Sequence, residues 1–244
     1  ALWWGGALAL SSTGSLQSVL ASVSAGPAPA LPLGVRYESC SVGYNFVAAR
    51  ASNGMVYAWG ANNWGQTVVP PLGSNQTYVK VDAGAQHAVA LRSDGTAMAW
   101  GDNSWGQTVI PPLPAGQSYI DVSAGVRDTL FVRSDGSVHL AGASGGIGSA
   151  PGLPSGVRYV RVACGDHMAI ALRSDGSVVS WGSPPVTVPP LPTGLSYVEI
   201  RCAIAIAIAR RSDGQVVVLG TATALSNPPT LGAGRSFLRV AANT

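Results

Sequence analysis

Charge is scarce in this sequence. Charged residues make up 10% of the 244 residues, and 14 basic and 11 acidic side chains leave a formal net charge of +3. Soluble domains usually carry about 25% charged residues, and a nucleic-acid-binding surface needs a larger basic excess. The composition therefore shows no footprint for nucleic acid. Hydrophobic residues reach 47%, so the shortage of charge does not indicate a disordered chain.

Cysteines are also few, and no long apolar run is present. Cys40, Cys164 and Cys202 are an odd number without C-x-x-C spacing, so the sequence predicts neither a disulfide framework nor a zinc site. No run of 18 apolar residues occurs, so we expect no membrane-spanning helix. Glycine (31) and proline (17) are abundant, and so many helix breakers disfavour a helical bundle.

A repeat of roughly 40 residues organises the chain. Its units open with an aromatic residue, at Tyr37, Tyr78, Tyr119, Tyr159, Tyr197 and Phe237. The tetrapeptide Arg-Ser-Asp-Gly recurs at 92–95, 133–136, 173–176 and 211–214, with Ala-Ser-Asn-Gly at 51–54. A Trp-Gly pair follows at Trp59, Trp100 and Trp181. Units of this length with a Trp-Gly signal are typical of propeller blades.

Each unit predicts four short strands. In residues 78–83, Val79, Val81 and Ala83 alternate with polar neighbours and are expected on one face. The second and third strands flank Asp94-Gly95, a hairpin signal in which we expect positive φ at both residues. Residues 108–110 predict a short outer strand, and Pro-rich linkers cross to the next unit.

The two ends of the chain complete the pattern. Residues 1–36 hold a degenerate repeat without an opening strand, and 237–240 read as such a strand. The uncharged residues 1–35 could instead be a targeting segment, but a signal peptide would not copy the hairpin register. We therefore predict one all-β domain over residues 1–244, a single β-propeller of about six four-stranded blades. Pairing of 1–36 with 237–244 would close the ring.

The repeats resemble those of the regulator of chromosome condensation family. The resemblance rests on Val81-Asp-Ala-Gly84, His87, Ala90-Leu91, Asp94-Gly95, Trp100-Gly-Asp-Asn103 and Trp105-Gly-Gln107. It is closest to the bacterial secreted branch around β-lactamase inhibitor protein II. It implies a propeller, usually seven-bladed, whose members bind partner proteins through one face. Six repeats depart from seven, which leaves a smaller ring or a blade absent from this chain.

Catalytic and metal-binding motifs are scarce. His87, His139 and His167 stand at three different repeat positions, and no H-E-x-x-H or nucleophile-elbow spacing surrounds them. For His87 a buried structural role is favoured over a ligand role. A propeller lyase or glycosidase would need paired carboxylates, for which Asp128 and Asp166 are the candidates. We expect a protein that is not an enzyme and holds neither cofactor nor metal.

The two sides of the predicted ring differ in how much they vary. Hairpins and Pro-rich linkers repeat almost unchanged on one side, whereas the three positions before each second strand, on the other side, differ in every unit. Such variation suits either a partner-binding surface or drift at unconstrained loop tips. The predicted contact residues are aromatic and arginine anchors with polar neighbours: Tyr44, Phe46, Trp64, Trp105 and Arg127, with Gln86, His87, Asp128, Asp166 and His167.

The sequence favours a non-catalytic propeller that binds protein outside the cell or at its surface. It would act alone or as one module of a larger surface or filamentous assembly. A soluble inhibitor of a secreted enzyme is the alternative. Asn75-Gln-Thr77 is a glycosylation sequon in a linker, and the low charge agrees with an extracellular location. The expected partner is a protein, with no nucleic acid and no membrane insertion.

Overall fold

The computed structural model describes residues 8–10, 16–18, 25–143, 146–183, 186–203 and 206–219. Within these residues the protein is all-β and contains no helix. The strands form five three-stranded antiparallel sheets and one two-stranded sheet of β1 (Leu8–Leu10) and β2 (Leu16–Ser18). We refer to the three-stranded sheets as blades 1 to 5, in chain order.

In every blade the second strand lies in the middle and pairs with the first and third. The first strands are β3 (Tyr37–Val42), β6 (Tyr78–Ala83), β9 (Tyr119–Ala124), β12 (Tyr159–Cys164) and β15 (Tyr197–Cys202). The second strands are β4 (Phe46–Ala51), β7 (His87–Arg92), β10 (Asp128–Arg133), β13 (Met168–Arg173) and β16 (Ala207–Arg211). The third strands are β5 (Val56–Gly60), β8 (Ala97–Gly101), β11 (Val138–Gly142), β14 (Val178–Gly182) and β17 (Val216–Leu219).

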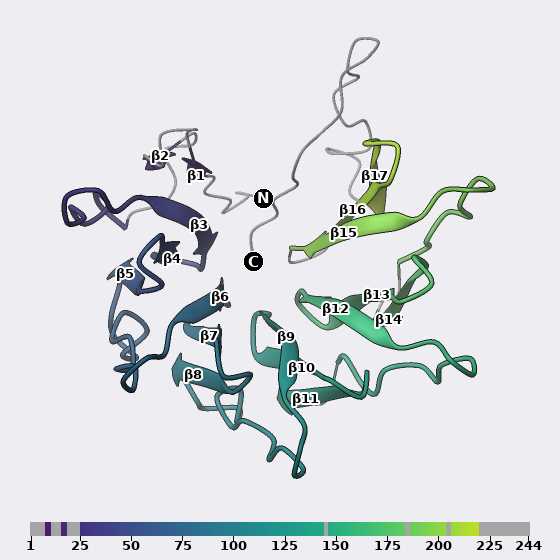
Figure 1. The fold of residues 1–244 in the computed structure, drawn as a ribbon, viewed down its shortest axis with the longest axis horizontal. Coiled ribbons are helices and arrows are strands. Elements are labelled where there is room, and N and C mark those ends of the chain that lie inside the picture. Colours follow the sequence, from purple (N-terminus) through teal and green to yellow (C-terminus); the bar gives the residue numbers. More distant parts are fainter. Residues whose placement is uncertain are drawn as a thin grey trace.

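The five blades are arranged around a common centre (Figure 1). The first strands of consecutive blades contact one another, and β1 contacts β3. The predicted fourth strand at 108–110 is wrong, because these residues form no strand and the Val109 amide instead closes a turn onto the Gly106 carbonyl. Two prolines follow, and they have no amide to give to a sheet. The predicted strand at 237–240 lies outside the described residues.

The tyrosine that opens each unit anchors the preceding linker. Its hydroxyl donates to a proline carbonyl eight residues earlier, in the pairs Tyr37–Pro29, Tyr78–Pro70, Tyr119–Pro111, Tyr159–Pro151 and Tyr197–Pro189. The core lies between neighbouring blades: Phe46 of blade 1 packs in one cluster with Tyr78 and Trp100 of blade 2. Trp100 and Trp181 are buried and Trp59 is half-buried against the Tyr37 cluster, so the tryptophans of the Trp-Gly pairs serve blade packing.

The predicted hairpins are present, with a different turn from the one expected. Gly95 has φ +78° and Gly136 has φ +85°, whereas Asp94 is not in the positive region. The Gly95 amide donates to the Arg92 carbonyl, and the Arg92 amide to the Thr96 carbonyl. This is a turn followed by a left-handed glycine. The Asp94 carboxylate accepts from the Thr96 amide at 2.9 Å, so the repeated aspartate closes the turn.

The simple alternation predicted for the first strands is interrupted by a bulge. The register of β6 against β7 shifts between Tyr78 and Lys80, so Val79 is an extra residue opposite its partner strand. Val79 is exposed while Val81 is buried, which corrects their assignment to one face. Cys164 and Cys202 are the last residues of β12 and β15, and both are free, buried thiols.

Candidate functional site

The variable loops of the repeat lie together on one side of the ring. In each of blades 1 to 4 the residue after the third strand donates its amide to the loop before the second strand, in the pairs Ala61–Asn45, Asp102–Gln86, Ala143–Arg127 and Ser183–His167. The hairpins lie at the opposite ends of these strands, where the Ser93 amide donates to the Thr77 carbonyl of a linker. We name as the loop face the loops 43–45, 84–86, 125–127 and 165–167 with the turns 61–67 and 102–108.

The loops of the loop face are locked to one another across the blades. The Tyr44 amide donates to Ala85 O at 3.1 Å, and the Ala85 amide donates to Gly125 O at 3.2 Å. A glycine opens each loop: Gly43, Gly84, Gly125 and Gly165. A Cβ at any of these would meet the equivalent carbonyl of the next blade at a distance that real Cβ atoms essentially never show. Close backbone approach therefore requires glycine here and holds the loops rigidly.

Two tryptophans stand out from the turns of this face. Trp64 is 50% and Trp105 is 52% exposed. Each turn is held from beneath by a buried glutamine: the Gln107 side chain accepts from the Trp105 amide at 2.9 Å and donates to Asp102 at 2.9 Å. Gln66 accepts from the Trp64 amide in the same way. The indoles are thus presented to solvent by a fixed backbone, as a rigid contact residue would be.

Arg127 joins two blades at the loop face. Its guanidinium lies 5.0 Å from the ring centroid of Trp105, a cation–π arrangement between blade 3 and the turn of blade 2. Tyr44 is 41% exposed, and the positive charge of Arg127 acts on its hydroxyl as well. Burial raises the pKa of the Tyr44 hydroxyl, Asp166 raises it further and Arg127 lowers it. Predicted contact residues from four blades therefore lie close enough to interact electrostatically.

An acidic group lies at the blade 4 end of the face. His167 Nε2 is 3.5 Å from Asp166 Oδ1, and His167 has φ +57°, which is uncommon for a residue other than glycine. Asp128 is 1% exposed, and its Oδ1 has no hydrogen-bond partner among the described residues. Burial raises the pKa of Asp128 to about 6, against the opposing effect of His167. Of the two candidate carboxylates, Asp128 is thus buried at the start of β10, whereas Asp166 is half-buried in the loop before β13.

Three of the predicted contact residues are buried and do not reach the surface. Phe46, His87 and Asp128 are the first residues of β4, β7 and β10, and their side chains enter the space between blades. Met168 and Ile206 at the equivalent positions are also buried. The third residue of each variable triplet therefore belongs to the core. Tyr44, Gln86 and Arg127 are exposed, and Asp166 and His167 are half-buried.

His87 has the structural role that its repeat position favours. Its Nε2 is 2.9 Å from Thr129 Oγ1, and that hydroxyl donates to the Gln107 carbonyl at 2.7 Å. Burial lowers the pKa of His87 to about 4, so the ring is neutral at pH 7. The network ties blade 2 to blade 3 below Trp105. The Gly-Gln pairs at 65–66 and 106–107 were the sequence signal for these supporting glutamines.

Two parts of the chain match a known repeat. Residues 78–107 and 159–184 match the family model of the regulator of chromosome condensation (RCC1) repeat. The first range contains all three strands of blade 2 and the turn that follows, and the second contains all three strands of blade 4. Among curated proteins, none matches the sequence. The resemblance is thus confirmed for the repeat, and the bacterial secreted branch stays a prediction.

Solved structures share the fold. Prp20p from Saccharomyces cerevisiae, described with its binding to Gsp1p and histones, has a TM-score of 0.69 at 17% identity, over 90% of this chain and 70% of Prp20p. The entire ectodomain of the receptor kinase CR4 from Physcomitrella patens gives 0.68 at 19%, over 93% and 64%. The CRINKLY WD40 ectodomain of ACR4 from Arabidopsis thaliana gives 0.64 at 21%, over 87% and 76%. At such identities these likenesses show an RCC1-like propeller fold.

The described part of the chain shows neither a metal-binding cluster nor a membrane-spanning helix. No three His, Cys, Asp or Glu side chains there gather in a way that could hold a metal ion. The same residues contain no helix long and apolar enough to cross a membrane.

Proposed function

We propose that this protein is a non-catalytic propeller that binds a protein partner through the loop face. One observation carries the proposal: exposed aromatic side chains, and Arg127 over the Trp105 ring, lie on loops that are hydrogen-bonded to one another across the blades. Aromatic and arginine side chains dominate binding energies at interfaces, and rigid ones lose little conformational entropy on binding. The proposed contact residues are Tyr44, Trp64, Gln86, Trp105, Arg127, Asp166 and His167.

The proposed location is outside the cell or at its surface. Two similar structures are ectodomains of receptor kinases. Asn75 of the sequon is exposed in its linker, where a glycosyltransferase could reach it. Prp20p, a propeller of the same fold, is described as binding proteins. We also propose that the two chain ends build a sixth blade. The protein would then act alone or as one module of a larger assembly.

Affinity capture followed by hydrogen exchange tests the proposed face. A partner recovered from the native source would be identified by mass spectrometry and purified. The amide exchange of this protein would then be compared with and without it. We expect slower exchange at 43–45, 84–86, 102–108 and 125–127, and no change at the hairpins 92–96 and 133–137. Protection confined to the hairpins or Pro-rich linkers would refute the assignment.

The captured partner also distinguishes an enzyme inhibitor from a binding module. If the partner is a secreted hydrolase, its activity is measured against increasing concentrations of this protein. Stoichiometric loss of activity identifies an inhibitor, whereas full activity in the complex identifies a binding module. A native mass equal to this chain alone, in a protein that runs as a monomer, would reject the larger assembly.

A further inference from the structure

Arg127 is a cation of the loop face that has no carboxylate partner. All 11 acidic side chains of the sequence belong to residues that the structure describes, and none of them forms an ion pair with Arg127. By contrast, Arg50, Lys80 and Arg210 each lie within 3.1 Å of a carboxylate oxygen. Among the described residues the Arg127 guanidinium also has no hydrogen-bond partner. Its side chain is exposed, so the charge is open to a partner.

The indole of Trp105 holds this guanidinium in place. The guanidinium carbon lies over the ring, 5.0 Å from its centroid. An arginine held over a ring keeps N–H groups at its edge for hydrogen bonding. The backbone is fixed at both ends of the contact: Gln107 accepts from the Trp105 amide at 2.9 Å, and the Ala143 amide donates to the Arg127 carbonyl at 3.2 Å. A partner therefore spends little free energy on ordering the pair.

The charges of the loop face fit one carboxylate and not a polyanion. Its loops contain one arginine and no lysine, and their acidic residues are Asp102 and Asp166. Asp102 accepts from the Gln107 side chain at 2.9 Å, and Asp166 lies 3.5 Å from His167 Nε2. A nucleic acid or another polyanion needs several cations along its binding site. A single carboxylate matches the single unpaired arginine.

The surroundings of Arg127 are aromatic. Trp105 is 52% and Tyr44 is 41% exposed, and the charge of Arg127 acts on the Tyr44 hydroxyl. An acidic side chain that reaches Arg127 would bring its neighbours against the indole. Bidentate hydrogen bonds between arginine and a carboxylate are stronger and more directional than bonds between neutral groups. The site thus suits an acidic residue with an apolar residue beside it.

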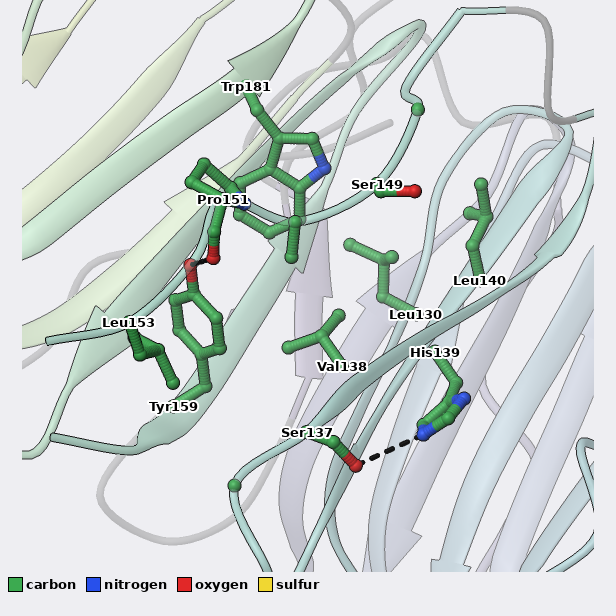
Figure 2. Close-up of a pocket in the computed structure, with 13 residues that line it drawn as sticks. Leu130, Ser137, Val138, His139, Leu140, Ser149, Pro151, Leu153, Tyr159 and Trp181 are labelled. Atoms are coloured by element: carbon green, nitrogen blue, oxygen red, sulfur yellow. Dashed lines mark hydrogen bonds between the residues drawn. The ribbon is translucent and has the colours of Figure 1, made fainter. Parts of the chain in front are cut away.

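The hairpin side of the ring provides a matched comparison. Arg158 is exposed there and forms no ion pair, but no ring of the described aromatic residues lies beneath its guanidinium. A pocket of about 620 Å³ also lies on this side, between blades 3 and 4, and no charged side chain lines it among the described residues. Figure 2 shows Ser137 and His139 of this pocket, which are hydrogen-bonded to each other at 3.0 Å. An acidic partner therefore meets an arginine held over a ring at the loop face only, as far as the chain is described.

We propose that Arg127, held over Trp105, binds an aspartate or glutamate side chain of the protein partner through two parallel N–H···O hydrogen bonds. An aromatic or aliphatic neighbour of that residue would lie against the Trp105 indole. The inference rests on the proposed function, because it names the chemistry of one contact made by the loop face.

Selection from a random 12-residue peptide library displayed on phage tests the proposal. Wild-type protein, Arg127→Gln and Arg158→Gln are immobilised as full chains and used in parallel. We expect Asp and Glu to be enriched at least about threefold in the wild-type and Arg158→Gln pools over the Arg127→Gln pool. Equal acidic content in the three pools would overturn the proposal, as would a wild-type selection that enriches no peptide.

One selected peptide then isolates the ion pair. It is synthesised with its acidic residue and with the matching amide, Asn for Asp or Gln for Glu, and both peptides are titrated by fluorescence anisotropy. Wild-type protein should bind the acidic peptide at least about fivefold more tightly, and Arg127→Gln should bind both equally. Arg127→Lys keeps the charge without the planar fork and should retain only part of the preference. Equal affinity of wild-type protein for the two peptides would refute the carboxylate contact.

Hydrogen exchange with the acidic peptide separates this inference from the proposed function. We expect slower exchange at 102–108 and 125–127. Protection there without a preference for the acidic peptide would contradict the carboxylate contact alone. Protection confined to the hairpins 92–96 and 133–137 would contradict both the contact and the loop face as the binding surface.

Discussion

At the scale of single residues, Asp128 is a buried carboxyl that reduces stability when ionised. Its folded-state pKa of about 6 lies above the ordinary value, so the carboxyl binds its proton more tightly in the folded protein than in the unfolded chain. The contribution of this residue to the free energy of unfolding therefore falls as pH rises from about 4 to 6. Asp128→Asn should raise stability by about 1 to 2 kcal/mol at pH 7, and the gain should vanish below about pH 4. Urea unfolding across this range measures both.

Asp175 serves as the control, because ionisation of its carboxyl stabilises the folded protein, whereas ionisation of Asp128 destabilises it. Hydrogen bonds from Ser177 lower the pKa of Asp175, so this exposed carboxylate favours folding when ionised. Asp175→Asn should lower stability at pH 7, and the loss should shrink as pH falls below about 4. A gain for Asp128→Asn that is the same at every pH would contradict the assignment of a raised pKa.

Asn75 allows its linker to adopt a left-handed backbone conformation, whether or not the side chain is glycosylated. It has φ +63°, and the four equivalent linker positions carry glycines with positive φ: Gly34, Gly116, Gly156 and Gly194. Asparagine is the side chain other than glycine that tolerates this region best. The repeat alignment contains this signal, because the other linkers have glycine where the sequon begins.

At the scale of elements, the hairpin glycines combine a special backbone conformation with close packing. Gly95 and Gly116 both have φ +78°, but a Cβ at Gly95 would meet Ser118 at 2.5 Å, whereas at Gly116 it would meet nothing within 4 Å. Gly116→Val should cost about 1 to 2 kcal/mol from φ alone, and Gly95→Val should cost more, up to about 3 kcal/mol. Chemical denaturation compares the two variants. Equal losses would show that packing against Ser118 adds nothing.

The strands could be predicted from local signals, and the exceptions depend on pairing. Opening tyrosines, Asp-Gly turns and Trp-Gly pairs each act within a few residues, so their repetition located the blades. The bulge at Val79 depends on which residue of β7 faces Lys80, and the sequence of β6 alone does not contain that information. Phe46 and Asp128 vary between units as loop residues do, yet they are buried because a neighbouring blade covers them.

At the scale of the whole molecule, we predict that the two ends of the chain pair to close the ring. An open ring would leave strand edges unpaired, which invites aggregation. Deleting residues 237–244 should lower the melting temperature by at least about 4 °C and promote aggregation, because the opening strand of the split blade would be lost. Thermal unfolding followed by circular dichroism and light scattering measures both effects. An unchanged melting temperature would refute closure by these residues.

The scaffold of the loop face could be predicted from the sequence, but its exposed residues only in part. The variable positions before each second strand located the loops, and Trp64, Trp105 and Arg127 lie exposed as expected. The stacking of Arg127 on Trp105 joins two blades and follows from their distance in space.

Binding at the loop face is tested most directly by the dissociation constants of arginine and tyrosine variants with the identified partner. Tyr44→Ala and Arg127→Ala should each weaken binding by more than about 1 kcal/mol, roughly fivefold, because they remove exposed anchors from a rigid surface. Arg92→Ala and Arg173→Ala, at the hairpin side, should leave the constant unchanged. Weakened binding in the hairpin-side pair, with the loop-face pair unaffected, would contradict the proposed function.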